Sequence, residues 1–107
     1  MNTHLIYQTI DHQHLDVLVN WAIGNYPDAG INLVECKDGR WFVEVDFGTK
    51  FDGIQGVSRP KVLPFAEPRF WGTEQEARDF AIACIKQAYP ETAAINLQQW
   101  FDNYDTE

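Results

Sequence analysis

The sequence predicts an α+β domain, in which a small antiparallel β-sheet of three to four strands packs against two main helices and a short C-terminal helix. Residues 31–47 contain two apolar segments separated by an Asp-Gly turn, which is typical of a β-hairpin. Residues 73–90 contain a capping box, an apolar stripe at helical spacing and a proline, which indicate a helix. With 107 residues and no internal repeat, we expect one domain spanning residues 1–107.

Two elements are predicted before the hairpin. Residues 4–9 alternate in polarity and are expected to form a strand. Asp11 is expected to cap a helix that ends at Tyr26, because apolar residues recur at helical spacing up to a Gly-Asn-Tyr-Pro stop. This helix is apolar on more than one face, so it is expected to be deeply buried or to contact a partner.

The histidines of residues 11–16 are the densest group of potential metal ligands. In the predicted helix, His12 and His14 would point about 200° apart and could not hold one ion together. His12 and Asp16 have the i, i+4 spacing that would suit a shared ion. Capping by Asp11 with two exposed histidines is the preferred interpretation, and no metal site is expected.

The hairpin is expected to turn through a two-residue loop of Asp38 and Gly39, which places Cys36 opposite Trp41 on the core face. The opposite face would then be half apolar and half acidic. Its candidate functional side chains are Glu35, Phe42, Glu44 and Asp46.

The segment from Lys50 to Phe70 differs in charge from the rest of the chain. Residues 48–72 contain four basic and two acidic residues, a net charge of +2, whereas the remaining residues contain four basic and fourteen acidic residues, a net charge of −10. We expect a packed crossing loop whose basic side chains pair with the protein's own carboxylates, or alternatively a binding loop. A further strand is predicted over residues 69–71.

Two helices are expected after this segment. Thr73 and Glu76 form the capping box of the first helix, and Glu74 and Arg78 are an i, i+4 ion pair on its surface. A short helix over residues 96–104 carries further aromatic side chains, including Trp100.

The composition excludes several classes of function. The formal net charge of −8 disfavours direct binding to nucleic acid or to an anionic membrane surface. Cys36 and Cys84 are not spaced as a disulfide framework or a zinc site, which favours a reduced, cytoplasmic setting. Neither a signal peptide nor an apolar run of roughly 18 residues is present, so no membrane span is expected. Without a catalytic motif, we expect neither an enzyme nor a bound cofactor.

The leading hypothesis is a small acidic protein-binding module that docks on a basic surface of a partner protein. Phe42 and Trp100 are expected to be exposed anchors of this contact. The acidic residues expected to take part are Glu35, Glu44, Asp46, Glu74, Glu76 and Asp79. In size and charge the chain is similar to phage-borne anti-CRISPR proteins and other nucleic-acid mimics, and this resemblance implies a role as an inhibitor of a nucleic-acid-binding protein.

Two other hypotheses remain open. A small enzyme or ligand-binding domain would hold an anionic ligand with Arg59 and Lys61, in a pocket under the loop of residues 50–70. A structural subunit would instead oligomerise through the first helix or the C-terminal aromatic side chains.

Overall fold

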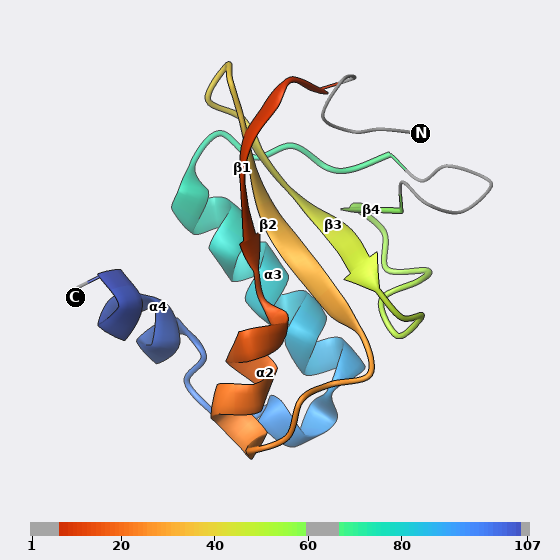
Figure 1. The fold of residues 1–107 in the computed structure, drawn as a ribbon, viewed down its shortest axis with the longest axis vertical. Coiled ribbons are helices and arrows are strands. Elements are labelled where there is room, and N and C mark those ends of the chain that lie inside the picture. Colours follow the sequence, from red (N-terminus) through yellow and green to blue (C-terminus); the bar gives the residue numbers. More distant parts are fainter. Residues whose placement is uncertain (1–6, 60–66, 106–107) are drawn as a thin grey trace.

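A computed structural model describes residues 7–59 and 67–105 and shows the predicted α+β architecture (Figure 1). Within these residues, four strands form one sheet in the order β1-β2-β3-β4. The strands are β1 (Thr9–His14), β2 (Gly30–Cys36), β3 (Trp41–Phe47) and β4 (Val57–Ser58). The helices are α2 (Asp16–Ile23), α3 (Glu74–Ala88), α4 (Gln98–Asp105) and the short 3-10 helix η1 (Pro90–Thr92). The sheet is mixed rather than purely antiparallel, because β4 runs parallel to β3.

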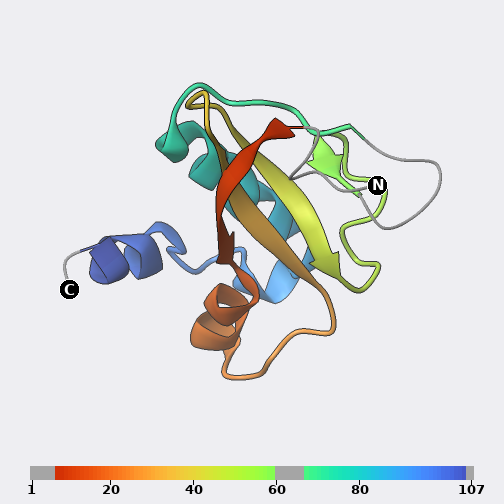
Figure 2. The ribbon, with the colours of Figure 1, turned by 45° about the horizontal axis from the view of Figure 1, so that its top comes forward.

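The helices lie mainly on one side of the sheet. Helix α3 crosses one face, which we call the inner face, while α2 lies at the end of the sheet below β1 (Figures 1 and 2). Helix α4 stands at the side of the molecule next to α3 (Figure 1). The main core fills the space between the inner face and the helices, and includes Leu18, Leu33, Val43, Ala81, Ile85 and Phe101. None of the described helices is long and apolar enough to cross a bilayer.

The first two elements differ from the prediction. Residues 11–14, expected to begin a helix, instead belong to β1 and pair antiparallel with β2. The helix starts only at Asp16 and ends at Ile23. Local pattern favoured a helix capped by Asp11, but a strand at this position gives the backbone of β2 a hydrogen-bonding neighbour, and this tertiary pairing prevails. Within the predicted strand of residues 4–9, only Thr9 is in a strand, and residues 4–6 lie outside the described residues.

The β2–β3 hairpin is present, but its register differs by one residue from the prediction. The loop contains three residues rather than two. The N–H of Cys36 donates to the carbonyl of Arg40 (2.8 Å), and the N–H of Gly39 donates to the carbonyl of Cys36 (3.0 Å). Gly39 has a φ of +90°, which is the left-handed position of a three-residue loop with a glycine bulge. Trp41 therefore pairs with Glu35 and not with Cys36.

This one-residue difference exchanges the two faces of β3 relative to β2. Val34 and Cys36 share the outer face of the sheet with Phe42, and all three are buried. The expectation that Phe42 is exposed is therefore wrong: its exposed fraction is 0%. Its ring makes edge-to-face contacts with Tyr7 and Phe70, with centroids 5.5 and 5.6 Å away. We call Tyr7, Phe42 and Phe70 the aromatic cluster.

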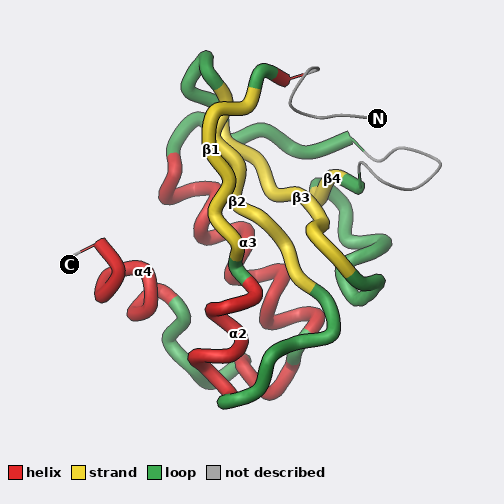
Figure 3. Tube along the Cα trace, viewed as in Figure 1, coloured by secondary structure: helices red, strands yellow, loops and turns green. Residues whose placement is uncertain are grey.

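The described parts of the segment 50–70 pack against the body of the protein (Figure 3). Phe51 is buried in the main core with an exposed fraction of 1%. The ammonium group of Lys50 lies 3.9 Å from Asp28, and the guanidinium of Arg59 lies 3.9 Å from Asp52. These contacts agree with the expectation that basic side chains of this segment pair with the protein's own carboxylates. Residues 60–66 lie outside the described residues.

The strand predicted over residues 69–71 is reduced to a single bridge. Trp71 exchanges two backbone hydrogen bonds with Trp41, of 2.8 and 2.9 Å. The short strand β4, which was not predicted, pairs with the same edge of β3 further along. Two separate parts of the chain therefore cover this edge.

Helix α3 follows the prediction closely. The hydroxyl oxygen of Thr73 accepts a hydrogen bond from the N–H of Glu76 (3.2 Å), and the same hydroxyl donates to the Glu76 carboxylate (3.0 Å). The carboxylate was expected to accept from the backbone N–H of Thr73, so the second bond of the capping box differs. The predicted ion pair is present, with 2.7 Å between Arg78 Nη2 and Glu74 Oε2.

Tyr89, which follows α3, connects that helix to the loop before β2. Its hydroxyl donates to the carboxylate of Asp28 (2.7 Å) and accepts from the buried N–H of Ala29 (3.1 Å). Burial, together with the hydrogen bond to Asp28, raises the pKa of Tyr89 to about 12. The neutral hydroxyl is therefore the form that stabilises the fold.

Tyr89→Phe is expected to lower the free energy of unfolding by about 1–3 kcal/mol at neutral pH, because it leaves the buried N–H of Ala29 without an acceptor. An unfolded tyrosine ionises near pH 10.0, below the folded value of about 12. The contribution of Tyr89 is thus complete below pH 10 and is lost as the pH rises through 12. Urea denaturation of both proteins at a series of pH values should show a constant difference below pH 10 that shrinks above it. A difference that stays constant to pH 12 would contradict this role.

Candidate functional site

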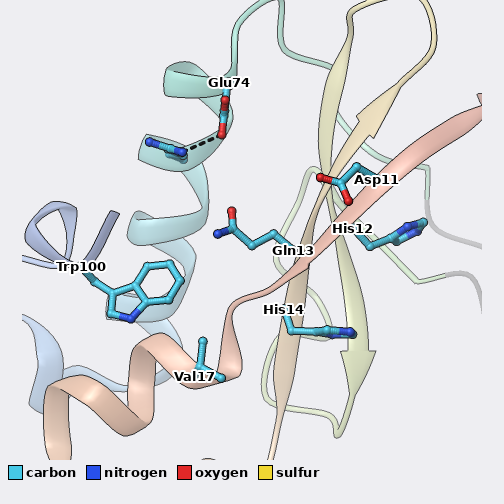
Figure 4. A pocket seen from close by; sticks show the side chains of 8 residues that line it. Asp11, His12, Gln13, His14, Val17, Glu74 and Trp100 are labelled. Carbon is cyan, nitrogen blue, oxygen red and sulfur yellow. Dashed lines mark hydrogen bonds and ion pairs between the residues drawn. The ribbon is translucent and has the colours of Figure 1, made fainter. Parts of the chain in front are cut away.

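An open groove of about 670 Å³ lies between the edge strand β1 and helices α3 and α4 (Figure 4). The side chains that define it come from β1, from the first turns of α2 and α3, and from α4. The lining residues are Asp11, His12, Gln13, His14, Val17, Glu74, Arg78 and Trp100. We call this the acidic groove.

The pairing of β1 with β2 directs two side chains of β1 into the acidic groove. Asp11 pairs with Glu35 and Gln13 pairs with Leu33, so both lie on the inner face of the sheet. Because side chains alternate along a strand, His12 and His14 point to the other side (Figure 4). Glu35 adjoins the acidic groove as the cross-strand neighbour of Asp11.

Helices α3 and α4 form the opposite wall of the acidic groove. Arg78 is 8% exposed, and its guanidinium lies over the ring of Phe101 at 4.6 Å from the centroid. Trp100 is half-buried and contacts Phe101 edge to face, with centroids 5.2 Å apart. The charges of Arg78 and Glu74 balance each other in their ion pair, so the net negative charge of the acidic groove comes from Asp11. The groove therefore combines a negative charge with the aromatic side chain of Trp100.

The predicted acidic face of the sheet does not form as a single surface. Glu35 lies on the inner face, whereas Glu44 and Asp46 lie on the outer face with Phe42. The three-residue loop of the hairpin is the reason, because it changes which side chains of β2 and β3 share a face. The grouping of Glu35 with Glu44 and Asp46 is therefore wrong.

The carboxylates on the outer face of the sheet lie beside histidines. His12 Nε2 lies 3.6 Å from Glu44 Oε2, and His14 Nδ1 lies 3.1 Å from Asp46 Oδ2. Glu44 is only 5% exposed. The prediction that His12 and His14 point apart is wrong, because both belong to a strand and lie two residues apart on one face.

The acidic residues of α3 have partners within their own helix or its cap. Glu76 accepts from the hydroxyl of Thr73, and Asp79 accepts from the side-chain amide of Gln75 at 2.8 Å. Both carboxylates are exposed. Glu74 is the predicted helix residue that reaches the acidic groove.

Few basic side chains among the described residues could hold an anion at the alternative site. Arg59 is half-buried, pairs with Asp52, and lines a pocket of about 220 Å³ that also contains the carboxylate of Glu67. Lys61 lies outside the described residues. Among the described side chains, the positive charge of Arg59 is thus already balanced by nearby carboxylates.

Asp11 and Gln13 were not among the predicted site residues. They had been placed at the start of a helix, where Asp11 would serve as a cap. Residues 11–14 are all polar and show no alternation of apolar and polar side chains, so their own pattern gave no signal for a strand.

No protein-family model matches the chain, and no curated protein or solved structure matches it significantly.

Proposed function

We propose that the chain is a non-enzymatic protein-binding module that receives a basic segment of a partner protein in the acidic groove. The observation that supports this proposal is the position of the Asp11 and Glu74 carboxylates in one groove with the indole of Trp100 (Figure 4). An arginine or lysine side chain can pair with a carboxylate and lie over an aromatic ring at the same time.

The charge of the whole chain supports the same class of partner. A net charge of −8 attracts a basic surface over a distance and increases the rate of association at low salt. Strongly basic protein surfaces are typical of nucleic-acid-binding proteins. The proposed partner is therefore a protein of that kind, whose binding to nucleic acid would be blocked while the module occupies its basic surface.

The anchor in this proposal is Trp100 and not Phe42. The ring of Phe42 is fully buried, whereas that of Trp100 is half-buried and lines the acidic groove. Aromatic side chains at the centre of an interface commonly contribute most of its binding energy, while the surrounding charges determine orientation. Val17, which is 37% exposed, extends the apolar part of the same groove.

A labelled arginine-rich peptide is the probe that tests the proposal. Fluorescence anisotropy at low salt is expected to show saturable binding to the wild-type protein and about tenfold weaker binding to Asp11→Asn, since one charge-assisted contact is lost. Glu91→Gln is the matched control, because it removes one exposed carboxylate of η1, outside the acidic groove. Its affinity should stay within about twofold of wild type if the local groove matters more than net charge.

The same titration identifies the outcomes that would contradict the proposal. Equal affinities for wild type, Asp11→Asn and Glu91→Gln would show that the peptide does not use the acidic groove. Equal losses in the two variants would show that only net charge attracts it. Amide chemical shifts that move on the outer face of the sheet, and not around Asp11 and Trp100, would place the contact elsewhere.

A further inference from the structure

A second group of polar side chains lies on the outer face of the sheet, on the other side of β1 from the acidic groove. It consists of His14 at the end of β1, Asp16 at the start of α2, and Asp46 in β3. One nitrogen or oxygen atom from each residue lies within 4.8 Å of the corresponding atoms of the other two. The side chain of His14 points away from Glu74 and Trp100 (Figure 4), although His14 also borders the acidic groove, whereas Asp16 and Asp46 do not line it.

The spacing of these atoms fits a metal ion. Two donors that each lie about 2.1 Å from one ion, at an angle of about 90–109°, are about 3.0–3.4 Å apart. The distance between His14 Nδ1 and Asp46 Oδ2 is 3.1 Å. An ion can therefore replace the hydrogen bond between these two atoms with little movement, and a small closing motion of Asp16 completes three ligands.

Asn32 provides an independent observation at the same place. In the register of the sheet it lies between His14 on β1 and Glu44 on β3, so its side chain shares the outer face with them. Asn32 is 6% exposed, and its buried Oδ1 atom has no hydrogen-bond partner among the described residues. A buried carbonyl oxygen without a donor is costly, and a cation or a water bound to that cation would satisfy it.

We propose that His14, Asp16 and Asp46 bind a divalent transition-metal ion, with the side-chain oxygen of Asn32 facing the ion or its bound water. Two carboxylates balance the charge of a divalent ion, and the imidazole favours Zn²⁺ and its transition-metal neighbours over Mg²⁺ or Ca²⁺. The ion would join the junction of β1 and α2 to β3, since His14 and Asp46 are 32 positions apart along the chain. Its binding would therefore stabilise the folded protein.

The test is a titration of the untagged protein with zinc chloride, followed by calorimetry and by thermal unfolding. Wild type is expected to bind one Zn²⁺ and to unfold at a higher temperature in its presence, with a smaller effect of magnesium chloride. His14→Asn is expected to weaken zinc binding at least tenfold, because it removes the nitrogen ligand. His12→Asn is the matched control, since His12 is the neighbouring histidine on the same face and contacts Glu44 instead. It should bind zinc as wild type does.

The identity of the ligands is checked by a spectroscopic measurement. Zinc should shift the imidazole nitrogen resonances of His14 and leave those of His12 nearly unchanged. If His14→Asn does not fold, as judged by circular dichroism, Asp46→Asn provides the same test with a side chain of nearly equal volume. Absence of zinc binding to wild type, or equal losses in His12→Asn and His14→Asn, would overturn the proposal.

Zinc binding and peptide binding are tested with different residues and different probes. Asp11→Asn should leave zinc affinity unchanged. Asp46→Asn, at a zinc ligand that does not line the acidic groove, should leave the affinity for the arginine-rich peptide within about twofold of wild type. Either site can therefore fail its test without affecting the result for the other.

Discussion

Replacing Phe42 by alanine is expected to lower the free energy of unfolding by about 3–5 kcal/mol. The ring has an exposed fraction of 0% and lies at the centre of the aromatic cluster, against Tyr7 and Phe70. Its removal would leave a cavity under two rings that come from distant parts of the chain. Urea denaturation measures this loss directly as a lower midpoint at constant slope.

Phe47→Ala is the matched control for this experiment. Phe47 lies on the same strand as Phe42, but it is 40% exposed at the end of β3. We expect its replacement to cost about 1–2 kcal/mol, because part of its surface is already in water. Similar losses at Phe42 and Phe47 would contradict the register of the hairpin, since the two-residue loop would place Phe42 on a more exposed face.

Gly48→Ala is expected to have the second large effect. Gly48 has a φ of +77°, a conformation that costs an alanine about 1–2 kcal/mol. A Cβ atom at this position would also lie 2.4 Å from the backbone oxygen of Asp28 and 2.6 Å from the Cα of Ala29. These are backbone atoms in the loop held by Tyr89, so they cannot move aside as a flexible side chain would. We expect a total loss of about 3 kcal/mol or more.

Gly53→Ala separates the two causes of this loss. Gly53 has a φ of +85°, but a Cβ atom there would meet nothing within 4 Å. Its replacement should therefore show only the conformational cost of about 1–2 kcal/mol. If chemical denaturation gives equal losses for both glycines, the close approach between Gly48 and the loop at Asp28 is not a significant constraint.

The elements with strong local signals were predicted well. Helix α3 has its cap at Thr73 and its ion pair between Glu74 and Arg78, because both depend on residues three or four positions apart. The C-terminal helix was expected over residues 96–104 and is observed as Gln98–Asp105. The hairpin was also located correctly. Its register was not, because Asp-Gly suits a two-residue loop and also a three-residue loop that ends in glycine.

The candidate sites could not be predicted in the same way. Both depend on the strand conformation of residues 11–14, which is set by pairing with β2 and not by their own pattern. When only its neighbours in sequence are considered, Asp11 fits the cap of a helix as well as it fits a strand whose side chains line a groove. His14 and Asp46 are 32 positions apart and meet only through the order of the strands. The positions of these side chains are therefore determined by pairing between distant strands and not by local sequence patterns.

The segment of residues 50–70 has a further consequence for the behaviour of the protein in concentrated solution. A free sheet edge invites pairing with a second molecule and so promotes aggregation. At the edge of β3 that faces away from β2, Trp41 pairs with Trp71, and Val43 and Glu44 pair with β4. β4, which belongs to this segment, and Trp71, which follows it, thus cover the edge of an apolar strand and keep it from pairing with a neighbouring molecule. At the opposite edge of the sheet, the bulge and the exposed charge of Asp11 in β1 disfavour the same kind of intermolecular pairing.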